Sequence, residues 1–140
     1  MTGKRTIRFR LLRDDRVAPT GDPSAPFGLQ DKDENLHPPI RRRDGVHVFD
    51  LELAVSEGPD GRPNFTGPFV FGPRDQRFVY LSWPRLDGGG YVNRIKVRLT
   101  DLDWPLIEKA IAGGVALEAD TSSRKPGGGM VAVSWRLGDG

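Results

Sequence analysis

A short segment in the middle of the sequence gathers the side chains best suited to holding a ligand. It contains Arg74, Asp75, Arg77, Tyr80 and Trp83. An arginine clamps a carboxylate or a phosphate through two parallel hydrogen bonds, and a tyrosine or tryptophan covers the apolar body of a ligand. The segment therefore predicts a binding site for a small anionic ligand. Its simpler interpretation is a turn and a hairpin that carry these residues on the surface.

A second set of candidates alternates along two predicted strands. Arg8 and Arg10 lie on the first strand, and Arg94, Lys96 and Arg98 lie on a later one. On one shared sheet face, Arg94 and Lys96 would extend the ligand site, and the whole stripe would suit nucleic acid. Alternating arginines are also common on solvated faces, where they prevent edge aggregation. Because the net charge of +2 is small for a nucleic-acid binder, nucleic acid is the disfavoured partner.

Catalysis without a cofactor is an alternative interpretation of the same residues. A cyclase or isomerase would need a carboxylate such as Asp50 or Asp75 as general base, with an arginine or Tyr80 stabilising charge. Nucleophilic hydrolysis is not indicated, because Ser82 lacks the flanking glycines of a nucleophile elbow. We therefore keep a small enzyme as the alternative to a binding protein.

The sequence predicts no metal site and no cofactor. It contains no cysteine, the acidic stretch 31–34 is typical of a solvated turn, and Asp101 and Asp103 precede a predicted helix, where carboxylates cap and stabilise the first turn. The glycine runs 88–90 and 127–129 precede strands rather than helices. A phosphate cradle needs a following helix, so hairpin loops are expected there.

Length and composition indicate one domain, residues 1–140, outside any membrane. A chain of 140 residues is too short for two domains that each bury a core. Arg8 and Arg10 interrupt any apolar stretch near the start, so no signal peptide is expected. No run of about 18 apolar residues occurs, and the lack of cysteine gives no sign of an oxidising compartment. The cytoplasm is the expected location.

Hydrophobic periodicity predicts strands along most of the chain and one helix. Residues 6–12, 46–57, 77–83 and 91–99 alternate apolar and polar positions, the period of a sheet with one buried face. Shorter strands are predicted at 27–30, 69–71, 115–120 and 130–137, and residues 14–45 are predicted to be mostly loop. The helix spans 104–112, with Trp104, Ile107, Ala110 and Ile111 on one face.

This order of elements predicts a mainly β fold of the α+β kind. Strand and helix do not alternate, which argues against a parallel α/β plan. About seven short strands with turns between them favour an antiparallel β-barrel or sandwich with one helix across it. The pattern does not decide between the barrel and the sandwich.

Two stretches resemble a known protein family. They are Asn64-Phe-Thr-Gly-Pro-Phe-Val-Phe-Gly-Pro-Arg74 and Arg77-Phe-Val-Tyr-Leu-Ser-Trp83, which are similar to the central signature of the uncharacterised bacterial domain-of-unknown-function family 5990. Arg94 to Leu99 and Thr121 to Trp135 are similar to its later strands. The resemblance implies a small stand-alone protein from high-GC bacteria and supplies no activity or site residues.

The resulting expectation is a non-catalytic accessory protein that binds a small anionic ligand or a protein partner. The small cofactor-free enzyme is the alternative, and weak nucleic-acid binding is the second alternative. An exposed edge strand would also allow a homodimer.

Overall fold

The computed structural model describes residues 3–14, 28–39, 41–43, 46–84, 91–122 and 130–138. Within these ranges, side chains are described except at 41–43, 83–84 and 91–93. The predicted glycine loops at 88–90 and 127–129 lie outside the described residues, as does most of the first half of the predicted loop 14–45.

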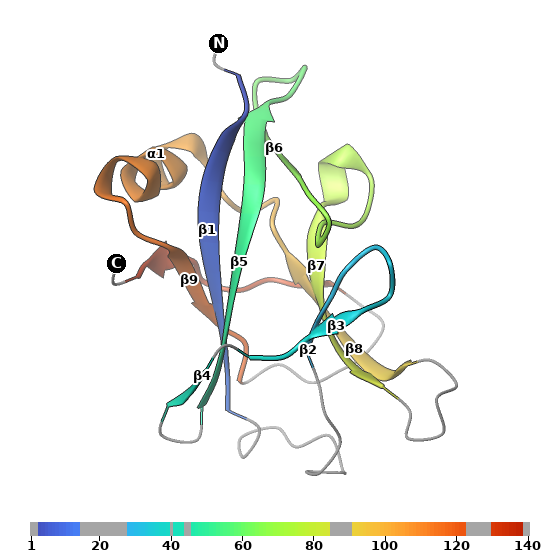
Figure 1. Ribbon diagram of the computed structural model, residues 1–140. Coiled ribbons are helices and arrows are strands. Elements are labelled where there is room, and N and C mark those ends of the chain that lie inside the picture. Colours follow the sequence, from blue (N-terminus) through green and yellow to red (C-terminus); the bar gives the residue numbers. More distant parts are fainter. Residues whose placement is uncertain are drawn as a thin grey trace.

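The described residues form two mixed sheets (Figure 1). The first sheet has the strand order β11-β9-β1-β5-β4, with β6 also paired to β5. Its β1–β9 pair is parallel and its other pairs are antiparallel. Its strands are β1 (Arg5–Arg13), β4 (Arg41–Arg43), β5 (Val46–Glu57), β6 (Pro63–Thr66), β9 (Leu117–Asp120) and β11 (Arg136–Leu137).

The second sheet has the strand order β10-β8-β7-β2-β3. Here β8 and β10 run parallel, and the other neighbours run antiparallel. Its strands are β2 (Gly28–Gln30), β3 (Leu36–His37), β7 (Phe78–Pro84), β8 (Tyr91–Arg98) and β10 (Met130–Val131). A single 3-10 turn, η1 (Arg74–Gln76), precedes β7.

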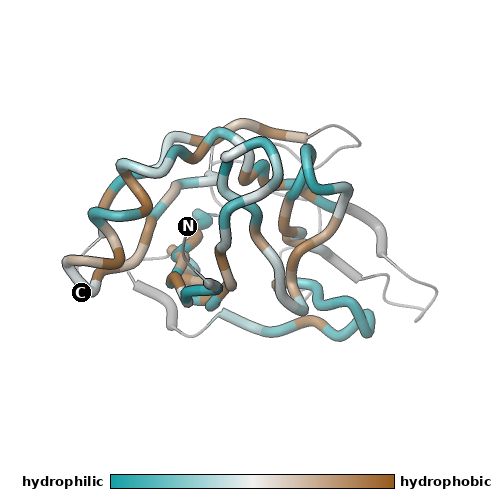
Figure 2. The backbone as a smooth tube through the Cα atoms, turned by 90° about the horizontal axis from the view of Figure 1, so that it is seen from above, coloured by the Kyte–Doolittle hydropathy of each residue, from teal (hydrophilic) through white to brown (hydrophobic). Residues whose placement is uncertain are grey.

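One apolar core fills the space between the sheets, because alternate residues of the long strands point inward. The central strand β5 buries every second residue from Phe49 to Val55, as its alternation predicts. Leu81 and Val97 of the second sheet belong to the same cluster. Figure 2 shows hydrophobic and hydrophilic residues following one another along these strands. The interior is therefore packed with side chains.

The helix α1 (Trp104–Gly113) confirms the predicted one over 104–112, with one more residue at its end. Ile107 and Ala110 are buried, and Trp104 and Ile111 pack partly against the core. The helix stops at Gly114, whose left-handed backbone (φ 63°) suits glycine. It lies beside the first sheet, on the side away from β7 and β8 (Figure 1). None of the helices in the described part combines the length and apolar composition needed to cross a bilayer.

The mainly β class with one helix is confirmed. The predicted antiparallel arrangement is wrong, because each sheet contains one parallel pair, and of the two alternatives the barrel is excluded for the described sheets. Neither described sheet closes into a barrel, because each ends in edge strands. The described residues contain eleven strands rather than about seven, since strands of two or three residues carry no periodic signal. Residues 69–71 form no strand; only Phe71 makes an isolated bridge, to Phe78, and the strand after the 58–62 turn is β6 instead.

Candidate functional site

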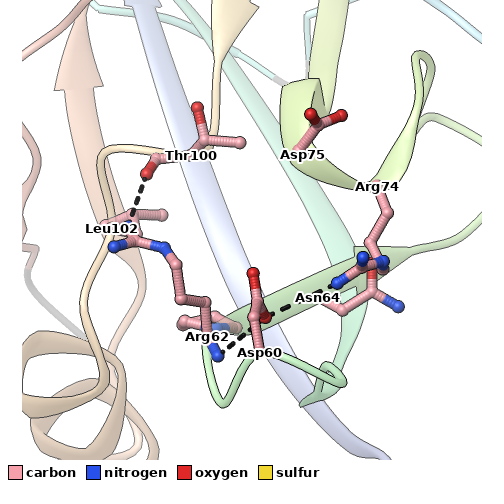
Figure 3. A pocket seen from close by; sticks show the side chains of 8 residues that line it. Asp60, Arg62, Asn64, Arg74, Asp75, Thr100 and Leu102 are labelled. Atoms are coloured by element: carbon pink, nitrogen blue, oxygen red, sulfur yellow. Dashed lines mark hydrogen bonds and ion pairs between the residues drawn. The ribbon is translucent and has the colours of Figure 1, made fainter.

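An open cleft of about 300 Å³ lies beside the turn that joins β5 to β6 (Figure 3). Three segments that are distant in sequence form its walls: the β5–β6 hairpin, η1, and the loop between β8 and α1. Its lining carries two arginines, two aspartates, an asparagine, a threonine and two apolar residues, namely Asp60, Arg62, Pro63, Asn64, Arg74, Asp75, Thr100 and Leu102.

The hairpin turn is held closed by its own backbone and by one aspartate. Gly58 donates its N–H to the carbonyl of Arg62 at 2.8 Å, and Gly61 donates to Gly58 at 2.9 Å. Gly61 has φ +81°, a conformation that favours glycine. The Oδ1 atom of Asp60 accepts the backbone N–H of Arg62 at 3.1 Å and lies 3.5 Å from Nη1 of Arg74. Asp60 thus links two walls of the cleft.

The second wall depends on a sharp turn at Gly72. This residue has φ +88°, and an added Cβ would lie 2.5 Å from the carbonyl oxygen of Gln76. The Gly72 carbonyl accepts a hydrogen bond from Nη1 of Arg77. This closure sets η1 against β6 and so brings Arg74 and Asp75 to the cleft.

The third wall is tied to the hairpin by a tryptophan. Trp104, the first residue of α1, donates its Nε1–H to the carbonyl of Gly61 at 2.8 Å. Arg62 donates to the carbonyl of Thr100 at 3.2 Å and lies 3.8 Å from the carboxylate of Asp103. These contacts hold the loop between β8 and α1 against the hairpin.

The arginines of the cleft use few of their hydrogen-bond donors. A guanidinium carries five N–H donors, and within the described residues Arg74 makes only the 3.5 Å ion pair with Asp60. Its side chain is 46% exposed and that of Arg62 is 59% exposed. Both cations therefore remain open to an incoming anion.

Two acceptors of the cleft lack partners among the described residues. The Oδ1 atom of Asn64 is buried without a hydrogen bond. Asp75 is exposed, and its carboxylate makes no hydrogen bond or ion pair with the described residues. The lining thus offers unused donors and unused acceptors together.

The structure divides the predicted ligand site into two parts. Arg74 and Asp75 lie in the cleft. Tyr80, Arg94 and Lys96 lie elsewhere, at alternate positions of β7 and β8 that point away from the core. Among the described side chains, Tyr80, Arg94 and Lys96 therefore do not line the cleft that holds Arg74 and Asp75.

Of the two remaining predicted residues, Arg77 has a structural role and Trp83 is described only in its backbone. Arg77 supports the Gly72 turn through its hydrogen bond to that carbonyl. Trp83 belongs to β7, and its side chain lies outside the described residues.

The outward face of β7 and β8 carries what we name the aromatic cluster: Phe71, Phe78, Tyr80, Arg94 and Lys96. The guanidinium carbon of Arg94 lies 5.0 Å from the Tyr80 ring centre, and the ammonium nitrogen of Lys96 lies 5.4 Å from that of Phe78. The rings of Phe71 and Tyr80 are 4.9 Å apart, as are those of Phe78 and Tyr80. These cations therefore already contact aromatic faces of the protein itself.

The predicted shared basic stripe is wrong, because its residues belong to different sheets. Arg8 and Arg10 are on β1 of the first sheet, whereas Arg94, Lys96 and Arg98 are on β8 of the second.

The members of the stripe are also less available than the alternation suggests. Arg10 is buried and pairs with Asp50 at 2.8 Å. On the second sheet, Arg98 pairs with Asp101 at 2.9 Å. Two of the five residues of the predicted stripe are therefore paired with carboxylates.

Sequence reasoning missed the hairpin half of the cleft. Asp60, Arg62 and Asn64 are not among the predicted site residues. Thr100 and Leu102 carried no signal. A charged pair flanking Gly61 at a hairpin tip is the one feature that marks this turn.

The other acidic candidates have structural roles. Asp31 is buried, not solvated as predicted, and it accepts the backbone N–H groups of Asp33 and Asn35 and the ring N of His37. The hydrogen bond from His37, and then that from Asn35, lower the pKa of Asp31. Asp103 stands at the helix N-cap without a side-chain capping bond. In the described part of the chain, no group of three or more potential ligands could hold a metal ion.

The fold, the cleft and the signature residues can now be compared with known proteins. The chain belongs to a family of unknown function, DUF5990, whose model matches residues 7–139. No curated protein and no solved structure matches the chain.

Proposed function

We propose that this protein is a non-catalytic, sandwich-like binding protein of the cytoplasm whose cleft holds a small ligand with an acidic group. The observation that carries the proposal is that two guanidinium groups, Arg62 on the hairpin and Arg74 on η1, line one cleft with most of their donors unused. An arginine fork matches the geometry of a carboxylate or a phosphate.

The volume of the cleft fits a metabolite-sized ligand. One water occupies about 30 Å³ of liquid, so the cleft of about 300 Å³ has room for roughly ten non-hydrogen atoms. This lies at the lower end of the usual range for ligand pockets.

Catalysis has less support than binding. The core between the sheets is filled by residues such as Phe49, Leu51 and Val97, so the described residues leave no reaction chamber there. Asp50 is committed to Arg10 at 2.8 Å, and Asp75 is exposed on η1. Neither carboxylate combines burial with an adjacent substrate cavity, the setting that tunes a general base.

Nucleic-acid binding also has less support. Phosphate binding needs several available cations on one surface, and the predicted stripe is split between two sheets. The rings suited to base stacking are in contact with Arg94 and Lys96.

The experiment that tests the proposal is a thermal-unfolding titration with inorganic phosphate and with malonate at constant ionic strength. A ligand that binds only the folded chain raises Tm as its concentration rises. We expect saturable stabilisation of the wild type. In the R62Q/R74Q variant, affinity should fall at least tenfold, because a hydrogen bond to a charged group contributes about 1.5–3 kcal/mol.

Arg136→Gln is the matched control for this titration. Arg136 is 53% exposed and pairs with Glu118 at 2.7 Å in the first sheet, far from the lining of the cleft. If R136Q and R62Q/R74Q respond alike, the anion binds elsewhere and the proposed site is wrong.

A further inference from the structure

The two arginines of the cleft offer different edges of their guanidinium groups to a ligand. Resting on the proposed function, we infer that Arg74 binds the acidic group of the ligand through two parallel hydrogen bonds and that Asp60 is the positioning residue that aims it. Arg62 adds a single contact. The ligand is therefore an oxyanion that presents two oxygens to one guanidinium, as a carboxylate or a phosphate does.

The first observation is which nitrogen of Arg74 is already engaged. A guanidinium makes a two-point contact along either of two edges, Nε with Nη2 or Nη1 with Nη2. The carboxylate of Asp60 lies 3.5 Å from Nη1, an atom that belongs to only one of these edges. Arg74 makes no other hydrogen bond or ion pair with the described residues. The edge formed by Nε and Nη2 therefore stays complete.

Arg62 is engaged at the nitrogen that both edges share. Its Nη2 atom donates to the carbonyl of Thr100 at 3.2 Å and lies 3.8 Å from Oδ1 of Asp103. An acid in a two-point contact with Arg62 would have to share this nitrogen with those acceptors. Arg62 therefore contributes its charge and one hydrogen bond, whereas Arg74 contributes a complete edge.

The second observation is the way in which Asp60 is held. Its Oδ1 atom accepts the backbone N–H of Arg62 at 3.1 Å inside the hairpin turn. Trp104 fixes this turn from the other side, through its 2.8 Å hydrogen bond to the carbonyl of Gly61. The same Oδ1 atom of Asp60 pairs with Arg74 (Figure 3). A fixed counter-ion restrains this long side chain before binding and so lowers the entropy cost of binding.

The third observation is the space at Gly58, against which the Asp60–Arg74 pair lies. A Cβ atom there would be 3.1 Å from Oδ1 of Asp60, 3.3 Å from Nη1 of Arg74 and 3.2 Å from the carbonyl oxygen of Arg62. Gly58 does not have a positive φ, so the backbone would accept alanine but its neighbours would have to shift. The close approach of the two charged groups therefore uses a residue without a side chain.

The first test exchanges each arginine for lysine, which keeps the charge and loses the two-point contact. Malonate is titrated into the full chain by isothermal calorimetry at constant ionic strength. Arg74→Lys should weaken binding about fivefold, because one hydrogen bond to the ligand is lost. Arg62→Lys should change the affinity by no more than about twofold. Equal losses in the two variants would overturn the assignment of the two-point contact to Arg74.

The second test removes the charge of Asp60. Asp60→Asn keeps an acceptor for the hairpin turn and takes a negative charge away from an anion site. Charge alone predicts tighter binding of malonate, whereas loss of the ion pair that aims Arg74 predicts binding about threefold weaker. Asp75→Asn is the matched comparison: it removes the same charge from the same cleft without an ion pair to Arg74, and it should tighten binding. Tighter binding to Asp60→Asn as well would overturn the role of Asp60.

A double-mutant cycle shows whether Asp60 acts through Arg74. Asp60→Asn should weaken malonate binding in the wild-type chain and have no further effect in the Arg74→Lys chain, because lysine has no two-point edge to aim. Gly58→Ala should follow the same pattern, since it displaces the pair without changing any charge. A purely structural role would give the same loss in both backgrounds, and that result would contradict the inference.

The outcomes distinguish the inference from the proposed function. If malonate and phosphate do not bind the wild type, or bind R62Q/R74Q equally well, the cleft is not an acid-binding site and both fail. If R62Q/R74Q loses malonate binding while Arg74→Lys and Asp60→Asn bind as tightly as the wild type, the inference alone fails.

Discussion

The cleft and the aromatic cluster each bring cations to the surface, but they use them differently. In the aromatic cluster, the guanidinium of Arg94 lies 5.0 Å from the centre of the Tyr80 ring. In the cleft, the one ion pair of Arg74 with the described residues is that with Asp60, at 3.5 Å. Arg94 thus contacts an aromatic ring of the protein, whereas most hydrogen-bond donors of Arg74 make no contact with the described residues.

This difference separates a stabilising surface from a binding surface. Cations on aromatic faces and rings in edge contact contribute to folding. Exposed ion pairs contribute little to it. Substitutions in the aromatic cluster should therefore change stability and leave ligand affinity intact, and substitutions of cleft arginines should do the reverse.

The largest effect is expected at Phe78. This ring is 9% exposed, lies within 5 Å of Tyr80 and stacks near Phe71. Phe78→Ala should lower the free energy of unfolding by about 3 kcal/mol, measured by urea denaturation. Arg62→Gln should change it by no more than about 0.5 kcal/mol. Similar losses in the two variants would remove the distinction between the surfaces.

The next largest effect is a difference in malonate affinity between variants of Arg74 and of Tyr80. Arg74→Gln should weaken binding of malonate about tenfold, because it removes a charge-assisted fork, and Tyr80→Leu should leave the affinity unchanged. Calorimetry measures both. A loss of affinity in Tyr80→Leu would show that the aromatic cluster takes part in binding.

A smaller effect is expected for the pairing of Arg94 with Tyr80. A double-mutant cycle with Arg94→Gln and Tyr80→Leu should give a coupling of about 0.5–1 kcal/mol in unfolding free energy. If the effects of the two single substitutions add, the ring and the guanidinium do not stabilise each other.

The smallest effect is the response of Trp104, which holds one wall of the cleft, to a fall in pH. The hydrogen bond from Arg5 lowers the pKa of Glu108, and the Arg5 guanidinium lies 5.8 Å from the Trp104 ring, which holds Gly61. A lowered carboxyl pKa contributes stability that is fully present above its ordinary value of about 4.3 and is lost as the pH falls through the lower folded value.

This predicts a pH-dependent signal from the tryptophan. The Trp104 indole N–H resonance should shift below about pH 4.3 in the wild type and should stay in place in Glu108→Gln, as followed by NMR. A shift of the same size in both proteins would show that protonation of Glu108 does not affect Trp104.

The long elements could be predicted from sequence because their periodicity is strong. The strand Val46–Glu57 and the helix Trp104–Gly113 have enough residues for a face to be recognised. The same periodicity misled at Arg10, which is buried. The parallel neighbour β9 covers that part of β1 and supplies Glu118 as a partner of Arg10, and the carbonyl of Thr121, just after β9, accepts a hydrogen bond from the buried Arg13. Pairing between distant strands leaves no local pattern.

Only half of the candidate site could be predicted, because contacts between distant segments leave no local sequence pattern. Arg74 and Asp75 stand out because charged and aromatic residues are close together in sequence. Their partners in the cleft, Arg62 and Asn64, are brought close only by the β5–β6 hairpin and the Gly72 turn. Alternation could show that Tyr80 and Lys96 point outward, but it could not show that the cleft lies on a different surface.

The most direct test of the account is an amide NMR titration of the full chain with malonate. The account predicts that the amides of residues 58–64 and 74–76 and the Trp104 indole shift along one saturating curve, while the amides of Tyr80 and Lys96 remain in place. Shifts confined to β7 and β8, with the cleft signals unmoved, would contradict the claim that this cleft is the binding site.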